Sequence, residues 1–228
     1  LNIDFVMVHI NYANRGDICE KEKQLLANWA NWANTHQIEL YIRDIYEINR
    51  AKCMKYDMRN LYEDYTRNVR YCAYSEVAKI KGWDNDVWCV LLAHNHDDCI
   101  ENILTNIANK SKYNNLKGME YDSYVKFNLE NSINFIRPLL SISKEEIYQY
   151  ANDQKIQYLQ DSTPQWSQRG KIRDIVRPAL VEWNQSILVG LEELSNVISD
   201  SMECVNLLVS NWMERIQLSN TLELKEQV

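Results

Sequence analysis

A cluster of acidic and imidazole side chains between residues 94 and 101 has the composition of a ligand-binding site. The stretch AHNHDDCIEN carries His94, His96, Asp97, Asp98 and Glu101. Asp98 and Glu101 are three residues apart and Asp97 is four from Glu101, so the three carboxylates would project from the first turns of one helix. Carboxylate oxygens suit Mg²⁺, with Asp97 and Asp98 as its ligands, or the ammonium group of an amine substrate.

Two other interpretations fit the same residues. A D-x-x-E capping box of Asp98 and Glu101 would need no ligand, since acidic residues oppose the helix dipole favourably in the first turn. A zinc site of His94, His96 and Asp98 lacks a recognised ligand spacing. We favour a functional site because two histidines accompany three carboxylates, which is more than capping requires.

The elements around the cluster predict how it is positioned. Three segments have the pattern of strands in a parallel sheet, namely IDFVMVHI (3–10), IELYIRDI (38–45) and VWCVLLA (87–93). Helices are predicted at 18–35, at 56–81 ending before Gly82, and from Asp98 onward. This alternation is typical of an α/β fold with a doubly wound, mainly parallel sheet, in which ligands bind at the carboxyl ends of the strands. The cluster follows the third strand, so it lies at that edge.

The second half of the chain contains another predicted strand and more helix. SINFIRPLL (132–140) has the pattern of a strand ending at Arg137, and Ser143 with Glu146 forms an S-x-x-E capping box for the next helix. Apolar spacing over 175–218 predicts one or two further helices. We place the domain boundary at residue 180, with a main α/β domain over 1–180 and a helical extension over 181–228.

Composition limits the class of protein. The chain has 228 residues, 46% of them hydrophobic, and no apolar run approaches the roughly 20 residues of a membrane helix, so we expect a cytoplasmic protein. Six dispersed cysteines without a C-x-x-C pair indicate neither a zinc site nor a disulfide framework. A net charge of -7 argues against non-specific coating of nucleic acid. RGKIRDIVR (169–177) is nevertheless locally cationic, which fits either a phosphate site or a solvated helix face.

Six motifs occur in order along residues 3–180. They are HINYANR (9–15), TRNVRY (66–71), AHNHDDCIEN (93–102), NLKGM (115–119), IRPLL (136–140) and DSTPQWSQRGKIRDIVRPAL (161–180). Together they resemble the catalytic domain of tRNA(Ile)-lysidine synthetases, in the PP-loop ATP pyrophosphatase superfamily. AHNHDDCIEN alone also resembles tRNA thiolation enzymes. Arg169 and Arg173 ahead of Arg177 point to the lysidine branch.

The resemblance implies an ATP-dependent ligase that uses ATP and Mg²⁺. The wobble cytidine of an isoleucine tRNA with a CAU anticodon would be adenylated, and the amino group of free lysine would displace AMP. By motif, Arg70 and Arg169 would bind phosphate or stabilise charge, while Asp98 and Glu101 would hold the lysine amines or Mg²⁺. The other matched residues would bind substrate or ATP: His9, Arg15, Arg67, His94, Asp97, Arg137 and Arg173. The resemblance also suggests a homodimer and no membrane partner.

The chain departs from the family pattern at several places, including Pro164, which stands where an asparagine is expected after DST. The S-G-G-x-D-S phosphate loop expected ahead of the strand at Ile3 does not occur, and because residue 1 is leucine we expect it in a preceding segment of a longer protein. NKSKYNN stands where relatives have a glycine-rich turn. Two alternatives therefore stay open: another PP-loop tRNA-modifying enzyme, and a non-catalytic descendant that binds tRNA or a partner.

Overall fold

The computed structural model describes residues 3–33, 38–83, 88–111, 113–116, 118–127, 132–160, 163 and 167–226. The chain divides into two compact units, and each is built from segments that are far apart in the sequence. Unit 1 comprises residues 1–93, 121–138 and 145–162. Unit 2 comprises residues 94–120, 139–144 and 163–228.

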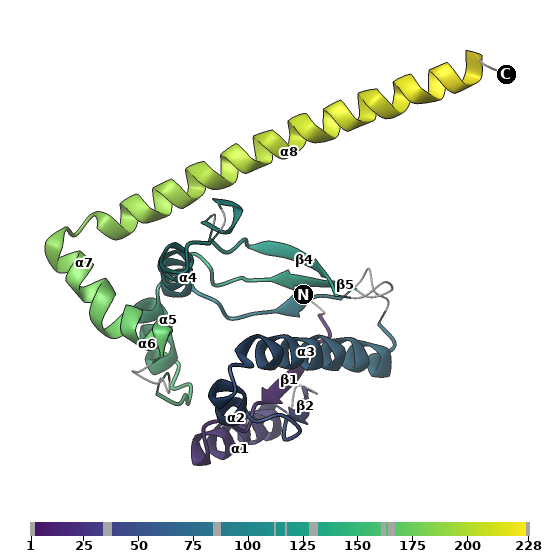
Figure 1. The fold of residues 1–228 in the computed structure, drawn as a ribbon. Helices are drawn as coiled ribbons and strands as arrows, with labels where there is room; N and C mark the ends of the chain where they lie inside the picture. The colour runs from purple at the N-terminus through teal and green to yellow at the C-terminus, as the bar shows by residue number, and fades with distance from the viewer. Residues whose placement is uncertain are drawn as a thin grey trace. The chain divides into compact units, whose positions relative to one another are not determined.

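A parallel strand pair begins unit 1. β1 (Val6–Asn11) pairs with β2 (Glu39–Asp44) in parallel, and α1 (Asp17–Ala33) connects them (Figure 1). The last register pair of the two strands is Asn11 with Asp44, and the Asn11 amide donates a hydrogen bond of 2.7 Å to the Asp44 carboxylate. Lys23 of α1 donates to the same oxygen at 3.1 Å. The carboxyl ends of the first two predicted strands therefore meet in a polar, charge-paired cluster.

A second, mixed sheet completes the strands described in unit 1. Its order is β3-β5-β4, with β3 (Val90–Leu91) parallel to β5 (Ser132–Ile136) and β4 (Asp122–Lys126) antiparallel to β5. The predicted strand at 87–93 is shorter than expected, and Val87 lies outside the described residues. β4 was not predicted, and it makes the sheet mixed. The predicted α/β class with parallel strands is confirmed.

α3 (Arg59–Lys81) contacts both strand layers of unit 1 (Figure 1). The rings of Tyr71 and Tyr74 lie 5.7 and 6.2 Å from that of the buried Phe135 on β5, and α3 also contacts β1. The helix ends at Gly82, as predicted, because this residue adopts a left-handed φ of 69°.

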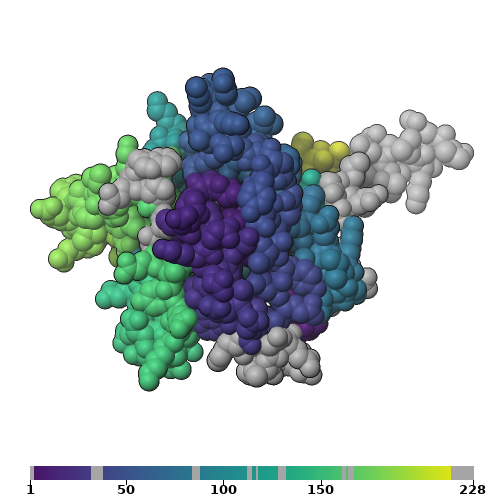
Figure 2. Space-filling model, turned by 90° about the horizontal axis from the view of Figure 1, so that it is seen from below, coloured from purple at the N-terminus to yellow at the C-terminus, as the bar shows by residue number. Residues whose placement is uncertain are grey.

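The helix predicted over 56–81 is α3, which begins three residues later than expected, at Arg59. A separate α2 (Arg50–Lys55) precedes α3 and is capped by the Asn49 side chain. Asp57 follows with a φ of 54°, which cannot continue a right-handed helix, so the chain turns before α3 begins. Figure 2 shows α1 in purple, with α2 and α3 in blue, reaching the surface on one face of unit 1.

α5 (Lys144–Asp153) starts directly after Ser143, where the S-x-x-E pattern predicts a helix N-terminus. Its residues from Glu145 onward belong to unit 1.

The described part of unit 2 is helical. Its elements are α4 (His96–Ala108), the 3₁₀ turn η2 (Tyr113–Leu116), α6 (Gln168–Lys171), the π-helical turn η3 (Ile172–Val176), α7 (Arg177–Trp183) and α8 (Ile187–Glu226). α8 contacts α4, η2 and α7 near its start. None of the helices in the described part of the chain combines the length and the hydropathy needed to cross a bilayer.

A glycine lets the chain pass close to α8. Gly118, from the NLKGM motif, has a φ of 74°, and a Cβ atom there would lie 3.1 Å from the Ser195 hydroxyl oxygen. Ser195 is buried on α8, so it has little room to move away. Gly118 is thus required both by its backbone conformation and by the approach of α8.

We predict that Gly118→Ala lowers the free energy of unfolding by about 2 kcal/mol, from the left-handed conformation and the tight contact together. Gly82→Ala is the matched control, because Gly82 has a similar φ of 69° with no atom within 4 Å of the added Cβ. It should cost only about 1 kcal/mol. Urea denaturation measures both values, and equal losses would show that the approach to Ser195 carries no cost.

Candidate functional site

The N-terminus of α4 fixes the acidic cluster by a capping box. Asn95 is the N-cap residue: its side chain accepts a hydrogen bond of 3.1 Å from the Asp98 backbone N–H. Asp98 returns the contact, because its Oδ2 accepts from the Asn95 backbone N–H at 3.2 Å. Asp98 is therefore the third helical residue, and a capping box made of Asp98 and Glu101 is wrong. One Asp98 oxygen stays available for other contacts.

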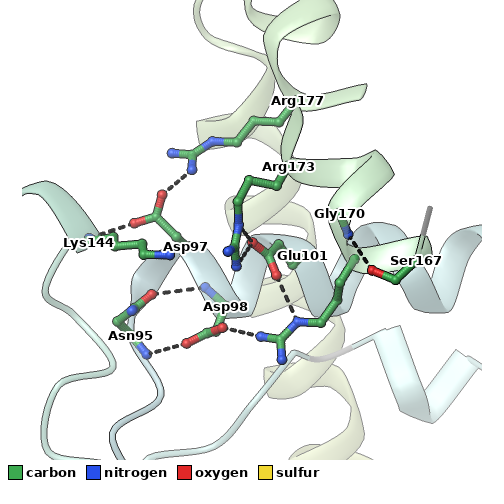
Figure 3. Close-up of polar contacts among 10 residues, drawn as sticks. Asn95, Asp97, Asp98, Glu101, Lys144, Ser167, Gly170, Arg173 and Arg177 are labelled. Atoms are coloured by element: carbon green, nitrogen blue, oxygen red, sulfur yellow. Dashed lines mark hydrogen bonds and ion pairs between the residues drawn. The ribbon is translucent and has the colours of Figure 1, made fainter. Parts of the chain in front are cut away.

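Glu101 is the buried centre of the cluster. Its side chain is 2% exposed and accepts hydrogen bonds from two arginines (Figure 3). Arg169 Nε donates to one oxygen at 2.9 Å, and Arg173 donates to the other from Nε at 2.7 Å and from Nη2 at 2.6 Å. A second nitrogen of Arg169 pairs with the free oxygen of Asp98. Arg169 thus bridges two carboxylates of α4.

Asp97 is buried at the other side of the same turn. One oxygen accepts a hydrogen bond of 2.7 Å from the Lys144 backbone N–H, and the other pairs with Arg177 (Figure 3). Burial alone would raise the pKa of Asp97, but the Lys144 hydrogen bond and the Arg177 charge outweigh it, so the pKa lies below the ordinary 3.8. Asp97 therefore stays charged at neutral pH.

The three arginines reach α4 because η3 interrupts the helix that carries them. Arg169, Arg173 and Arg177 are four residues apart, and in a regular α-helix two such steps would turn the side chains by about 80°. The wider π turn over Ile172–Val176 lies between Arg169 and Arg177 and offsets this rotation. Single π turns of this kind are frequent at functional sites.

We call these contacts the acid–arginine network. It consists of three acids, Asp97, Asp98 and Glu101, and the three arginines that pair with them. The cationic segment 169–177 was expected to bind phosphate or to be a solvated face. A solvated face does not describe Arg173 and Arg177, which are partly buried against the acids, whereas Arg169 is paired but half exposed. Lys171 is exposed.

The geometry does not fit Mg²⁺ at Asp97 and Asp98. Each oxygen of the two carboxylates already accepts a hydrogen bond or pairs with a guanidinium group. Magnesium would need such oxygens directed at one point, with water completing the shell. No group of three or more His, Cys, Asp or Glu side chains in the described residues is arranged to hold a metal. Asp97 and Asp98 thus act here as partners of arginines and a backbone N–H rather than as metal ligands.

The two histidines of the cluster lie beside the network. His96 Nε2 lies 3.1 Å from a carboxylate oxygen of Glu192 on α8. His94 is half-buried and precedes the N-cap residue Asn95. The ion pairs described for the acids on α4 are with arginines.

The other predicted site residues lie in unit 1, each with its own local contacts. Burial lowers the pKa of His9 on β1 below 6.5, against the opposing effect of nearby acids. Arg15 pairs with Glu22 at 2.7 Å and Arg67 with Asp64 at 3.1 Å, while Arg70 lies 5.6 Å from the Tyr71 ring centre. Arg137 donates to the Ser123 hydroxyl at 2.9 Å. Their binding roles stay predictions.

Two residues of the site were not among the predicted binding residues. Arg177 pairs with Asp97, and Asn95 holds Asp98 in the capping box. The equal spacing of the three arginines was visible in the sequence, but a four-residue spacing over two turns does not predict a common face unless a π turn is known. Asn95 was missed as the N-cap residue because the acids that follow it suggested a helix start at Asp98.

Comparison with known proteins places the chain in a family. The family model described as the PP-loop domain matches residues 1–182, which is well over half of the chain. The chain belongs to the PP-loop domain family.

Three curated relatives of this PP-loop protein carry the same name. The chain is 28% identical over 177 residues to the tRNA(Ile)-lysidine synthase of Malacoplasma penetrans, covering 78% of this chain and 54% of the relative. It is 28% identical over 211 residues to that of Mesoplasma florum, covering 92% and 46%. It is 30% identical over 197 residues to that of Enterococcus faecalis, covering 85% and 38%. The chain thus spans about half or less of these relatives' length.

A solved structure supports the PP-loop fold. The U34-tRNA thiolase NcsA from Methanococcus maripaludis, solved with its [4Fe-4S] cluster, matches with a TM-score of 0.56 at 18% identity. The match covers 86% of this chain and 63% of that one. At this identity the likeness shows the fold alone.

We predict that the two carboxylates held by Arg169 differ in their importance for stability. Glu101→Gln should lower the free energy of unfolding by about 3 kcal/mol, because it breaks a buried ion pair and leaves the largely buried Arg173 without its acid. Asp98→Asn should cost about 1 kcal/mol or less, because its partner Arg169 is 52% exposed. Urea denaturation of both variants measures the difference; equal losses would contradict the central place of Glu101.

The depressed pKa of Asp97 predicts a pH-dependent contribution to stability. A carboxylate with a lowered folded-state pKa stabilises the fold above its unfolded value of 3.8 and loses that contribution as the pH falls through the folded value. The loss of stability in Asp97→Asn should therefore be full at pH 6 and shrink steadily below pH 4. Denaturation at a series of pH values measures it, and a loss independent of pH would mean that the Asp97 charge does not matter.

Proposed function

We propose that this chain forms the catalytic core of an ATP-dependent ligase of the tRNA(Ile)-lysidine synthase type. The wobble cytidine of an isoleucine tRNA with a CAU anticodon would be adenylated, and the amino group of free lysine would then displace AMP. The observation that carries the proposal is the acid–arginine network, which is built from AHNHDDCIEN and RGKIRDIVR. The names of the curated relatives agree with it.

The chemistry requires opposite charges in one site. An amine substrate enters as a cation and needs carboxylates, whereas the triphosphate and the departing AMP need cations. α4 supplies the first through Asp98 and Glu101, and the helix after Ser167 supplies the second through Arg169 and Arg173. Catalysis would then rest on the positioning of reactants and on electrostatic stabilisation.

The nucleotide would bind at the carboxyl edge of the parallel strands, where α/β folds bind ligands. In unit 1 this edge carries Asn11 and Asp44 at the ends of β1 and β2. His9 and Arg15 flank it along the chain, and the resemblance gives both a role in ATP or substrate binding. ATP use agrees with the PP-loop family, and the homodimer and the domain boundary at residue 180 stay predictions.

The other interpretations have less support. A thiolation enzyme would be expected to have paired cysteines in the closing motif, and residues 161–180 contain none. A non-catalytic descendant would need the buried Glu101 and its arginines for stability, but Asp98, whose partner Arg169 is 52% exposed, contributes little to stability and is nevertheless present.

The proposal predicts transfer of labelled lysine to an isoleucine tRNA transcript by the complete native protein in the presence of ATP. Asp98→Asn should reduce the transfer rate by about 100-fold or more, because the amine loses a charged partner, while the fold stays intact. Asp200→Asn, an exposed acid on α8, is the control and should keep the wild-type rate. Wild-type rates in Asp98→Asn would mean that this carboxylate only caps α4.

A further inference from the structure

We infer that Arg169 occupies, in the free protein, the position of the substrate's ammonium group, so that amine binding exchanges one cation for another at Asp98. The inference rests on the proposed function, because it concerns the same carboxylates. It adds that Arg169 competes with the amine and thereby sets the affinity for it.

The charges of the network support an exchange rather than an addition. Asp97, Asp98 and Glu101 carry three negative charges, and the three arginines carry three positive ones. Among these six side chains every acid already faces a guanidinium group, so an added cation would have to share an acid with an arginine. Once Arg169 withdraws, one negative charge is uncompensated, which matches a single ammonium group.

Arg169 is the arginine that can leave with the least cost. Its side chain is 52% exposed, compared with 22% for Arg173 and 32% for Arg177, so water can take over more of its solvation. When it leaves, the buried Glu101 keeps both hydrogen bonds from Arg173 at Oε1, and Oε2 is left for the incoming ammonium group. The network would therefore stay folded around the vacated position.

Asp98 is the acid that the exchange releases. Its Oδ1 pairs with Arg169, and its Oδ2 is held by the Asn95 backbone N–H. Asp97, in contrast, keeps Arg177 and the Lys144 N–H. The released Oδ1 and the adjacent Glu101 oxygen, which Arg169 now bridges, would both accept from an ammonium, which has three donors. The ligand class is therefore a primary alkylammonium such as the lysine side chain.

Equilibrium binding of labelled L-lysine to the complete protein, measured by dialysis, tests the exchange. Arg169→Met removes the competing cation and keeps an unbranched side chain, so it should bind lysine about tenfold more tightly than wild type, which corresponds to about 1.4 kcal/mol. Lys171→Met removes an exposed cation two residues away and is the matched control for general charge effects. Its affinity should stay within about twofold of wild type.

A second variant separates charge from shape. Arg169→Lys keeps a cation on a flexible stem, so lysine affinity should stay close to wild type if competition by charge is the cause. If Arg169→Met fails to fold, the lysine affinities of Arg169→Lys and Arg169→Gln are compared instead. The inference then predicts tighter binding by Arg169→Gln, which lacks the competing charge.

The outcomes distinguish the inference from the proposed function. Tighter binding by Arg169→Met but not by Lys171→Met supports the exchange. If wild type binds lysine and Arg169→Met binds it equally or more weakly, the exchange is wrong. Equal binding would mean that Arg169 has no effect on lysine, and weaker binding that it contacts lysine directly. The proposed function would stand in both cases. If neither wild type nor any variant binds lysine, and no lysine is transferred to tRNA, both the exchange and the proposed function are wrong.

Discussion

The buried carboxylate of Glu101 is the constraint on which the acid–arginine network depends. A charged group that is 2% exposed needs partners for both of its oxygens, and Arg169 and Arg173 provide them from a segment about 70 residues further along the chain. The contact therefore forms only when α4 and the helix around η3 have both folded. Asp97 and Asp98 precede Glu101 on the first turns of α4, so the folding that pairs Glu101 also brings these two acids to the arginines.

Much of the architecture was predictable because it follows from local patterns. The apolar runs at 3–10 and 38–45 became β1 and β2, and the polar cluster became the start of a helix. β4 was missed because its burial alternates over five residues between polar segments, which is too short to stand out. The capping box was assigned three residues too late, because the acids drew attention away from Asn95.

The apolar pattern of α8 predicted a helix correctly but says little about burial. Ile198 is buried, whereas Val205, Leu208 and Trp212 further along the helix are more than half exposed. Periodicity records which residues share a face, and whether that face is covered depends on tertiary structure. The acid–arginine network was likewise only partly predictable. The residue types suggested the chemistry, but the pairing depends on a π turn, which the four-residue spacing of the arginines does not reveal.

If Arg169 withdraws when the substrate binds, α4 offers Asp98 to an ammonium group. The most direct test is a crystal structure of the complete protein with L-lysine and a non-hydrolysable ATP analogue. We expect a lysine nitrogen within hydrogen-bonding distance of Asp98, with Glu101 still held by Arg173 and Arg169 turned away from both acids. Lysine bound elsewhere, with the Arg169 contacts to Asp98 and Glu101 unchanged, would contradict the account.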